Sequence, residues 1–345
     1  MSHQNNTDSI PAGINTIDTV DMHTCGEPLR IITAGLPDIP GETIAAKRKY
    51  FAEHYDNIRT RLMYEPRGHA DMYGAVLTEA LSEGADFGTF FMHNEGYSTM
   101  CGHAVIALTR YVIESGFVKK EGDEPVLEID VPAGRIKSRA YMRNDRVQKV
   151  SFVNVPSFLL IRDETVEVRG IGRVNFDVAY GGAFYVFCDA DDLGLNLDGS
   201  DYFKLIDYGR KIKSAVMENF RIDHPFRADL GFLYGTIFTG KPYNYKNWSR
   251  NVCIFAEGQV DRSPTGSGLS ARAALHYSKG EISANERLTI ESILGTTMDV
   301  EVKEVLEYGP HQAVSPEVSG MAYYTGRSEF MVEPDDPLGK GFIFR

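Results

Sequence analysis

The chain has 345 residues, 43% hydrophobic and 24% charged, which are the proportions of an ordinary globular protein. At roughly 100–200 residues per domain, its length indicates about two domains. Acidic residues outnumber basic ones by 48 to 36, and the resulting formal charge of −12 disfavours binding to nucleic-acid backbones. The polar segment 1–14 predicts a tail without a signal peptide, and the lack of a long apolar run predicts no association with a membrane.

The first third of the chain alternates short apolar runs with one amphipathic segment. Within residues 41–63, apolar side chains recur at spacings of 7, 4, 3 and 4, which predicts a single amphipathic helix. Residues 103–114 are apolar on nearly all sides, which is typical of a buried helix. The short runs predict strands at 29–36, 72–78 and 87–93.

Beyond residue 118 the pattern is mostly that of strands, interrupted by two helices. Residues 204–219 predict a helix with a polar face, and the small apolar residues of 267–278 predict a second buried helix. Strands are expected at 126–131, 136–142, 147–153, 165–168, 173–178, 183–188, 233–239 and 251–255, and across 288–332. The order predicts an α+β protein in which each of two halves wraps a sheet around one buried helix, with the boundary near residues 118–135.

A thiol and a hydroxyl stand at matching positions before the two buried helices. Cys101 lies 15 residues before Gly116, and Thr265 lies 15 residues before Gly280, which indicates a duplicated unit. The unsatisfied N–H groups and partial positive charge of a helix start stabilise a thiolate, so we expect a lowered pKa for Cys101. A buried structural cysteine is an equally supported interpretation of the residues alone.

The segment before the second helix, 261–268, combines a proline with two glycines. Its exposed backbone amides suit a carboxylate or phosphate group at the helix start. On the residues alone, a simpler interpretation is favoured, in which Thr265 or Ser267 only caps the helix. Asp261 can similarly be a turn residue.

Other polar clusters carry weaker signals. Residues 21–27 contain potential metal ligands but no recognised set, and a turn at the end of a strand is preferred. The segments 67–71 and 180–185 are interpreted as structural. The cysteines form no CxxC pair, which favours free thiols in a reducing cytoplasm, and Cys188 and Cys253 are predicted to be inert core residues.

Five segments, in order, resemble the proline racemase family, which includes 4-hydroxyproline epimerases and trans-3-hydroxy-L-proline dehydratases. They are 21–28, 66–74, 100–103, 180–185 and 261–268. The resemblance implies a diaminopimelate-epimerase-like fold of two similar halves, each with a mixed sheet curled around a central helix. Residues 15–128, completed by strands at about 320–345, would carry Cys101, and residues 129–319 would carry Thr265. It also implies a homodimer that needs no cofactor and no metal.

By the same resemblance, Cys101 and Thr265 are the catalytic pair in a cleft between the halves. Racemases of this family have a cysteine at both places, and a threonine at the second place is similar to the dehydratase branch. The implied substrate-binding residues are Gly102, His103, Asp261, Gly266 and Ser267. The amides at the two helix starts would hold the substrate carboxylate, with Asp261 and His103 near the ring nitrogen.

One thiol predicts elimination rather than racemisation. Racemisation needs a proton donor on each face of the α-carbon, and a threonine hydroxyl is too weak an acid and base for that exchange. In trans-3-hydroxy-L-proline the α-hydrogen and the 3-hydroxyl share one ring face, so Cys101 alone can start a syn elimination of water. The group that protonates the departing hydroxyl stays open among Cys101, Thr265 and a water molecule. The alternatives are a hydroxyproline epimerase or proline racemase with another group in place of the second thiol, and a catalytically silent imino-acid-binding relative.

Overall fold

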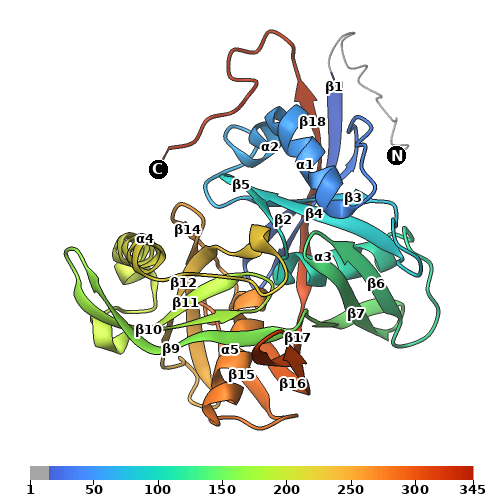
Figure 1. The fold of residues 1–345 in the computed structure, drawn as a ribbon. Coiled ribbons are helices and arrows are strands. Elements are labelled where there is room, and N and C mark those ends of the chain that lie inside the picture. The colour runs from blue at the N-terminus through green and yellow to red at the C-terminus, as the bar shows by residue number, and fades with distance from the viewer. Residues whose placement is uncertain (1–14, 345) are drawn as a thin grey trace.

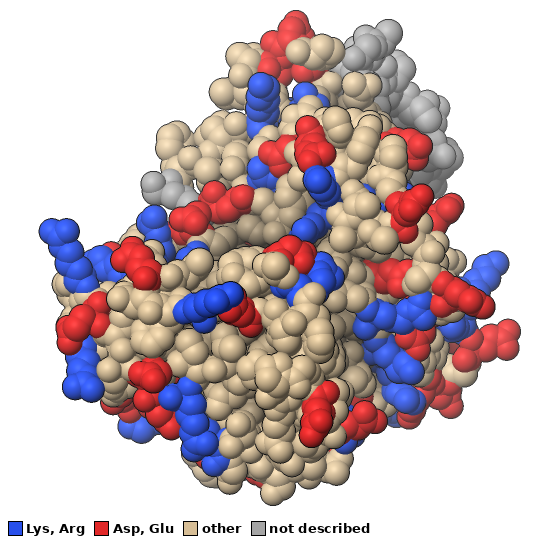
Figure 2. Space-filling view, viewed as in Figure 1, with Lys and Arg blue, Asp and Glu red and all other residues tan. Residues whose placement is uncertain are grey.

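The computed structural model describes residues 15–344, so the predicted tail 1–14 lies outside the described residues. The strands form one hydrogen-bonded network that mixes parallel and antiparallel pairs, and few helices accompany them (Figure 1). None of the helices in residues 15–344 is both long and apolar enough to span a membrane. On the face seen in Figure 2, basic and acidic side chains are interspersed, with no continuous basic surface.

The helix α3 (Gly102–Glu114) is enclosed by strands from both ends of the described chain. The preceding strands are β1 (Asn15–Thr24), β2 (Glu27–Ala34), β3 (Tyr73–Thr78), β4 (Phe87–His93) and β5 (Gly96–Ser98), and the following ones are β6 (Val126–Val131), β7 (Gly134–Arg143) and β8 (Arg146–Val153). The last strand, β18 (Ala322–Val332), pairs antiparallel with β1. Val105, Ile106 and Leu108 are fully buried, so the apolar surface of α3 is covered as its sequence predicted.

The segment 41–63 forms two helices, so the prediction of a single helix was wrong. The helix α1 (Ile44–His54) ends at Tyr55, whose φ of −130° interrupts the helical backbone, and α2 (Asp56–Met63) follows at once. Asp56 places a carboxylate in the first turn of α2, where it pairs with Arg59 at 2.6 Å. The apolar residues of α1 and α2 pack in one core cluster, so their spacing continues across the break. The periodicity therefore does not reveal where the first helix ends.

The helix α5 (Gly266–Lys279) is enclosed in the same way by later strands. These are β9 (Ser157–Val168), β10 (Gly172–Tyr180), β11 (Phe184–Asp189), β12 (Leu233–Gly240), β13 (Ser249–Phe255), β14 (Gln259–Val260), β15 (Arg287–Glu291), β16 (Thr297–Tyr308) and β17 (His311–Gly320). The helix α4 (Tyr202–Asn219) packs outside these strands, and short 3₁₀ turns lie at Asp191–Leu193, Gly199–Asp201 and Ala228–Leu230. β17 pairs with β8 as well as β9 and β16, so it joins the two groups of strands.

The two buried helices begin against each other. A Cβ atom added to Gly102 would lie 2.7 Å from the Cα of Gly266, and one added to Gly266 would lie 2.8 Å from the Cα of Gly102. Real side chains do not tolerate such distances, so glycine at both positions lets the helix starts meet. Gly181 packs similarly, since a Cβ there would lie 2.2 Å from the carbonyl oxygen of Ser267, which agrees with the structural interpretation of segment 180–185.

Candidate active site

A narrow pocket with a cavity volume of about 20 Å³ lies where α3 and α5 begin. Its lining residues are Glu27, Tyr73, Met100, Cys101, Gly102, His103, Tyr185, Tyr234, Cys253, Phe255, Asp261, Thr265, Gly266 and Ser267. All seven site residues predicted from the sequence are among them. Their roles stay predictions, but the structure brings them together from segments far apart in the chain.

Cys101 caps α3 at the pocket wall, and only 5% of its surface is exposed. The expectation of a lowered pKa was wrong, because burial raises the pKa of the Cys101 thiol well above its usual value. The amide of Ala104 and the hydroxyl of Tyr73 lower this pKa, whereas the carboxyl groups of Asp261 and Glu27 raise it further. Desolvation outweighs the helix start, and the thiol is the resting form.

His103 lies directly beside that thiol. Its Nδ1 atom is 3.1 Å from the Cys101 Sγ atom, and burial lowers the pKa of the imidazole to about 3, so the ring is neutral. A neutral imidazole has one donor and one acceptor nitrogen. Since the ring donates to the carbonyl of Pro28, the other nitrogen is left to accept the proton of the Cys101 thiol. His103 can therefore accept a hydrogen bond from the thiol and orient the sulfur.

We expect the alkylation of Cys101 to be slow at neutral pH and strongly pH-dependent. Because the thiolate is the reactive form, the rate with iodoacetamide should rise about tenfold per pH unit through pH 8 and beyond. Peptide mass spectrometry at each pH measures this rate for Cys101 separately from the other cysteines. A rate that already levels off below pH 8 would show that the helix start, not burial, controls the thiol.

Thr265 precedes α5 in the same way as Cys101 precedes α3. Its side chain makes no capping hydrogen bond, so the interpretation of Thr265 as a simple cap was wrong. The hydroxyl lies close enough to Asp261 to lower the pKa of that carboxyl, yet it makes no well-aligned hydrogen bond within the described residues. Its φ of 67° is rare for a β-branched residue, and such backbone strain is concentrated at functional sites.

The first turn of α5 is held by a hydrogen bond to the pocket wall. Ser267 Oγ pairs with the Tyr185 hydroxyl at 2.7 Å, so its side chain is occupied by the pocket wall rather than by capping. Tyr73 and Tyr234 complete an aromatic wall, and burial raises the pKa of both phenols well above the usual value, which keeps them neutral. The buried hydroxyl of Tyr234 lies close enough to the Tyr73 hydroxyl for that group to lower the pKa of Tyr234, and both residues line the pocket.

Two carboxyl groups share the pocket. Asp261 is 6% exposed and accepts a 2.7 Å hydrogen bond from the backbone N–H of Ser263, so it shapes its turn as well as facing the pocket. Glu27 is fully buried, and its Oε2 atom accepts the backbone N–H of Arg262 at 2.7 Å. Burial raises the pKa of both groups. The sequence placed Glu27 only in a turn, because nothing in its local pattern shows that β2 begins beside residues 261–265.

Cys253 is a core residue of β13, as its sequence predicted, and the pocket also reaches its side chain. Its side chain is fully buried, and burial raises the pKa of its thiol well above the usual value, while Thr265 lowers it. The backbone N–H of Asp261 donates to the carbonyl of Cys253 at 3.0 Å, which fixes β13 beside the loop 261–265. In contrast, Cys188 lies in the core around α4, away from the pocket.

Comparisons with known proteins agree with this arrangement. The proline racemase family profile matches residues 19–343. A trans-3-hydroxy-L-proline dehydratase of Colwellia psychrerythraea is 52% identical over 330 residues, covering 96% of this chain and 93% of that protein. The human trans-3-hydroxy-L-proline dehydratase is 45% identical over 339 residues, covering 96% of each chain.

The solved structures point to the same group of proteins. The crystal structure of a hydroxyproline epimerase from Agrobacterium vitis, with bound trans-4-hydroxy-L-proline, superposes with a TM-score of 0.89. It is 26% identical and covers 96% of both chains. The family match over nearly the whole described chain, together with two relatives above 40% identity, establishes that this chain belongs to the proline racemase family.

Proposed function

We propose that this chain is a trans-3-hydroxy-L-proline dehydratase in which Cys101 is the base. The observation that carries the proposal is the asymmetry of the pocket: Cys101 stands at the start of α3, and Thr265 stands at the start of α5. A thiol can exchange a proton with carbon near neutral pH, and a threonine hydroxyl cannot. The names of the two relatives above 40% identity support the same activity.

The helix starts supply the electrostatics of the reaction. The amides of Gly102, His103, Gly266 and Ser267 can hold the substrate carboxylate at the positive ends of two helices. Negative charge that develops when the α-proton leaves spreads onto this carboxylate, where the helix starts stabilise it. Cys101 removes the α-proton, the 3-hydroxyl leaves as water, and the enamine product tautomerises to Δ1-pyrroline-2-carboxylate.

Substrate binding favours the thiolate that the reaction needs. The ring nitrogen of the substrate carries a positive charge at neutral pH and can lie beside Asp261. That charge offsets the negative charge of Asp261, which raises the pKa of Cys101. The substrate carboxylate acts in the opposite sense, but the two helix starts compensate its charge.

Incubation with trans-3-hydroxy-L-proline tests the proposal directly. We expect an imine product that gives a coloured adduct with o-aminobenzaldehyde, and loss of one water per substrate by mass spectrometry. L-proline and trans-4-hydroxy-L-proline, which have no 3-hydroxyl, are the matched control substrates. Brisk inversion of these two compounds, with the 3-hydroxylated one left intact, would refute the dehydratase.

A second candidate function is the epimerisation of a hydroxyproline, because Cys253 brings a second thiol to the Thr265 side of the pocket. The solved hydroxyproline epimerase has the same fold. If Cys253 were the second acid, inversion at the α-carbon would depend on it. Chiral chromatography of wild-type and Cys253→Ala reactions separates the two functions, since the dehydratase should keep its activity in the variant.

We also propose the diaminopimelate-epimerase-like division into two similar halves, each with a sheet curled around one helix. The pairing of β18 with β1 supports completion of the first half by the C-terminal strand. β7 and β8 pack on α3, which supports a boundary after residue 153 rather than at residue 128. A homodimer located in the cytoplasm remains part of the proposal, and sedimentation of the purified protein measures its assembly.

A further inference from the structure

Glu27 is a buried carboxyl group in the pocket that the reaction above leaves without a role. Its side chain is 0% exposed and lines the same pocket as Cys101. The Oε2 atom accepts the N–H of Arg262, whereas Oε1 accepts no hydrogen bond from any N–H or O–H group of residues 15–344. A buried polar atom that lacks such a partner marks a place where a ligand group can bind.

Glu27 and Asp261 form a pair that holds one proton. A hydrogen bond with Glu27 lowers the pKa of Asp261, whereas burial and the charge of Asp261 raise the pKa of Glu27 well above its usual value. Two carboxyl groups can form a hydrogen bond only when one of them is protonated. Glu27 is therefore the acid of the pair and Asp261 the carboxylate, and the pair as a whole carries the single negative charge that matches one ring-nitrogen cation.

The turn that carries Glu27 is held between the two helix starts, because Glu27 itself accepts the N–H of Arg262 in the loop before α5 while the end of β1 bonds to α3. The Thr24 hydroxyl donates to the carbonyl of His103 at 2.8 Å, which ties the end of β1 to the first turn of α3. On the other side, the Thr296 hydroxyl donates to the carbonyl of Cys25 at 2.7 Å. Glu27 therefore approaches the pocket from the strand that packs on the helix of the base.

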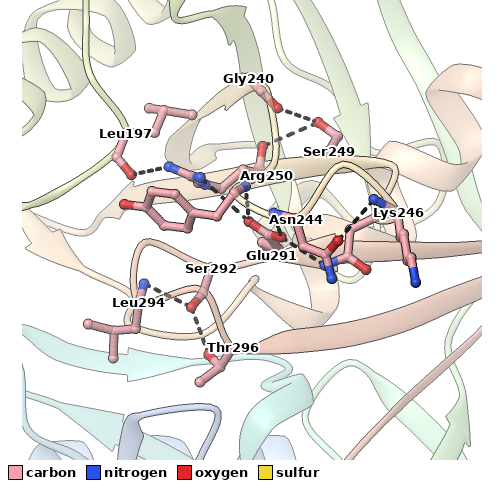
Figure 3. A network of polar contacts seen from close by, with 12 residues as sticks. Leu197, Gly240, Asn244, Lys246, Ser249, Arg250, Glu291, Ser292, Leu294 and Thr296 are labelled. Atoms are coloured by element: carbon pink, nitrogen blue, oxygen red, sulfur yellow. Dashed lines mark hydrogen bonds and ion pairs between the residues drawn. The ribbon is translucent and has the colours of Figure 1, made fainter.

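A polar network stabilises the segment behind that turn (Figure 3). Ser292 pairs with the Thr296 hydroxyl at 2.7 Å and accepts the N–H of Leu294 at 3.0 Å. The neighbouring Glu291 accepts hydrogen bonds from the loop before β13 and pairs with Arg250 at 3.5 Å. Through Thr296, this network connects to the Cys25 carbonyl, two residues before Glu27.

The stereochemistry of the substrate relates these positions to the chemistry. The α-hydrogen and the 3-hydroxyl lie on one ring face, so a base and an acid for syn elimination must reach the ring from the same side. We propose that Glu27 is the acid that protonates the departing 3-hydroxyl, while Asp261 holds the ring nitrogen. This inference rests on the dehydratase proposed above and assigns the proton donor that the sequence left open.

The proton balance of the step closes within the pocket. The Cys101 thiolate takes the α-hydrogen as a proton, the C–H electron pair forms the C2–C3 double bond, and the C3–O bond breaks. The oxygen leaves with the Glu27 proton as water, so the step ends with a Cys101 thiol and a Glu27 carboxylate. After product release Glu27 takes up a proton from solvent, and Cys101 gives one up to solvent when the next substrate binds and favours the thiolate, so the whole cycle neither gains nor loses a proton.

Glu27→Gln tests the proposal because the amide keeps an acceptor for Arg262 and a donor for Asp261 but has no acidic proton. We expect dehydration of trans-3-hydroxy-L-proline to fall about 10²-fold or more, as is usual for loss of a general acid. Chloride needs no proton to leave, so elimination from trans-3-chloro-L-proline should stay within about tenfold of wild type. Asp261→Asn is the matched comparison, and we expect it to raise KM for both substrates alike.

The outcomes separate this inference from the dehydratase itself. A wild-type protein that does not dehydrate the 3-hydroxy substrate refutes the proposed function. Wild-type dehydration with full activity in Glu27→Gln refutes only the role of Glu27. Equal losses on the hydroxy and chloro substrates also refute it, since they mean that Glu27 acts on the base or on the fold.

A measurement on the wild-type protein keeps the test independent of any variant. Because Glu27 must be protonated to act, the ratio of the dehydration rate to the chloride-elimination rate should fall as the pH rises above the pKa of Glu27. The ionisation of Cys101 changes both rates equally and cancels in the ratio. A ratio that does not fall at any pH at which the enzyme stays folded and active would refute the assignment.

Discussion

Replacing Cys101 with serine should lower dehydration of trans-3-hydroxy-L-proline by about 10³-fold or more, because a positioned base contributes 10²–10⁴-fold and a serine hydroxyl is a far weaker base. Serine has nearly the same shape and is compatible with the extended backbone of Cys101, whose φ is −147°. Loss of packing is therefore a small effect at this position. The rate of imine formation at saturating substrate measures the change.

Cys188→Ser is the control for this experiment. Cys188 is also a buried thiol, 3% exposed, but it lies in the core around α4 and does not line the pocket. We expect this variant to lose some thermal stability while it keeps kcat. Substantial turnover by Cys101→Ser would remove Cys101 from its proposed role. Loss of activity in Cys188→Ser would show that the assay reports the stability of the protein instead of the chemistry at Cys101.

The parts of the site that the sequence predicted are those coded locally. A small nucleophilic residue followed by glycine and an apolar run marks a buried helix start, and both Cys101 and Thr265 stand at such starts. Gly102 and Gly266 were predicted to expose backbone amides. The structure shows that glycine is also required for packing, because a Cβ atom on either residue would clash with the backbone of the other. That contact joins residues 164 positions apart, so no local pattern contains it.

The parts that the sequence missed depend on burial and on contacts across the chain. The raised pKa of Cys101 follows from desolvation and from Asp261 and Glu27, whose positions relative to the thiol are fixed only by the complete fold. Cys253 looked like a core residue because it is one: its side chain is fully buried, and the pocket happens to reach it. Helix starts can be read from sequence, whereas the electrostatic surroundings of a buried group cannot.

Replacing Thr265 with cysteine should give the pocket a second thiol and create racemase activity. The new sulfur would stand at the start of α5, where the threonine hydroxyl has no well-aligned partner within the described chain and is free to be replaced. Cysteine lacks the β-branch, so the φ of 67° should be no harder to adopt than for threonine. We expect conversion of L-proline to D-proline at least about tenfold above wild type, because a positioned acid contributes 10²–10⁴-fold.

Solvent exchange makes this prediction specific to the opposed geometry of the two helix starts. In D₂O, the D-proline formed by Thr265→Cys should carry deuterium at the α-carbon, because the second thiol returns a solvent-derived proton on the other face. Thr265→Ser keeps a hydroxyl of similar size and should form no D-proline. Adding Cys101→Ser to Thr265→Cys should abolish inversion, since racemisation needs both thiols. Absence of α-deuterium from proline after prolonged incubation with Thr265→Cys would mean that residues 101 and 265 do not face opposite sides of a bound ring.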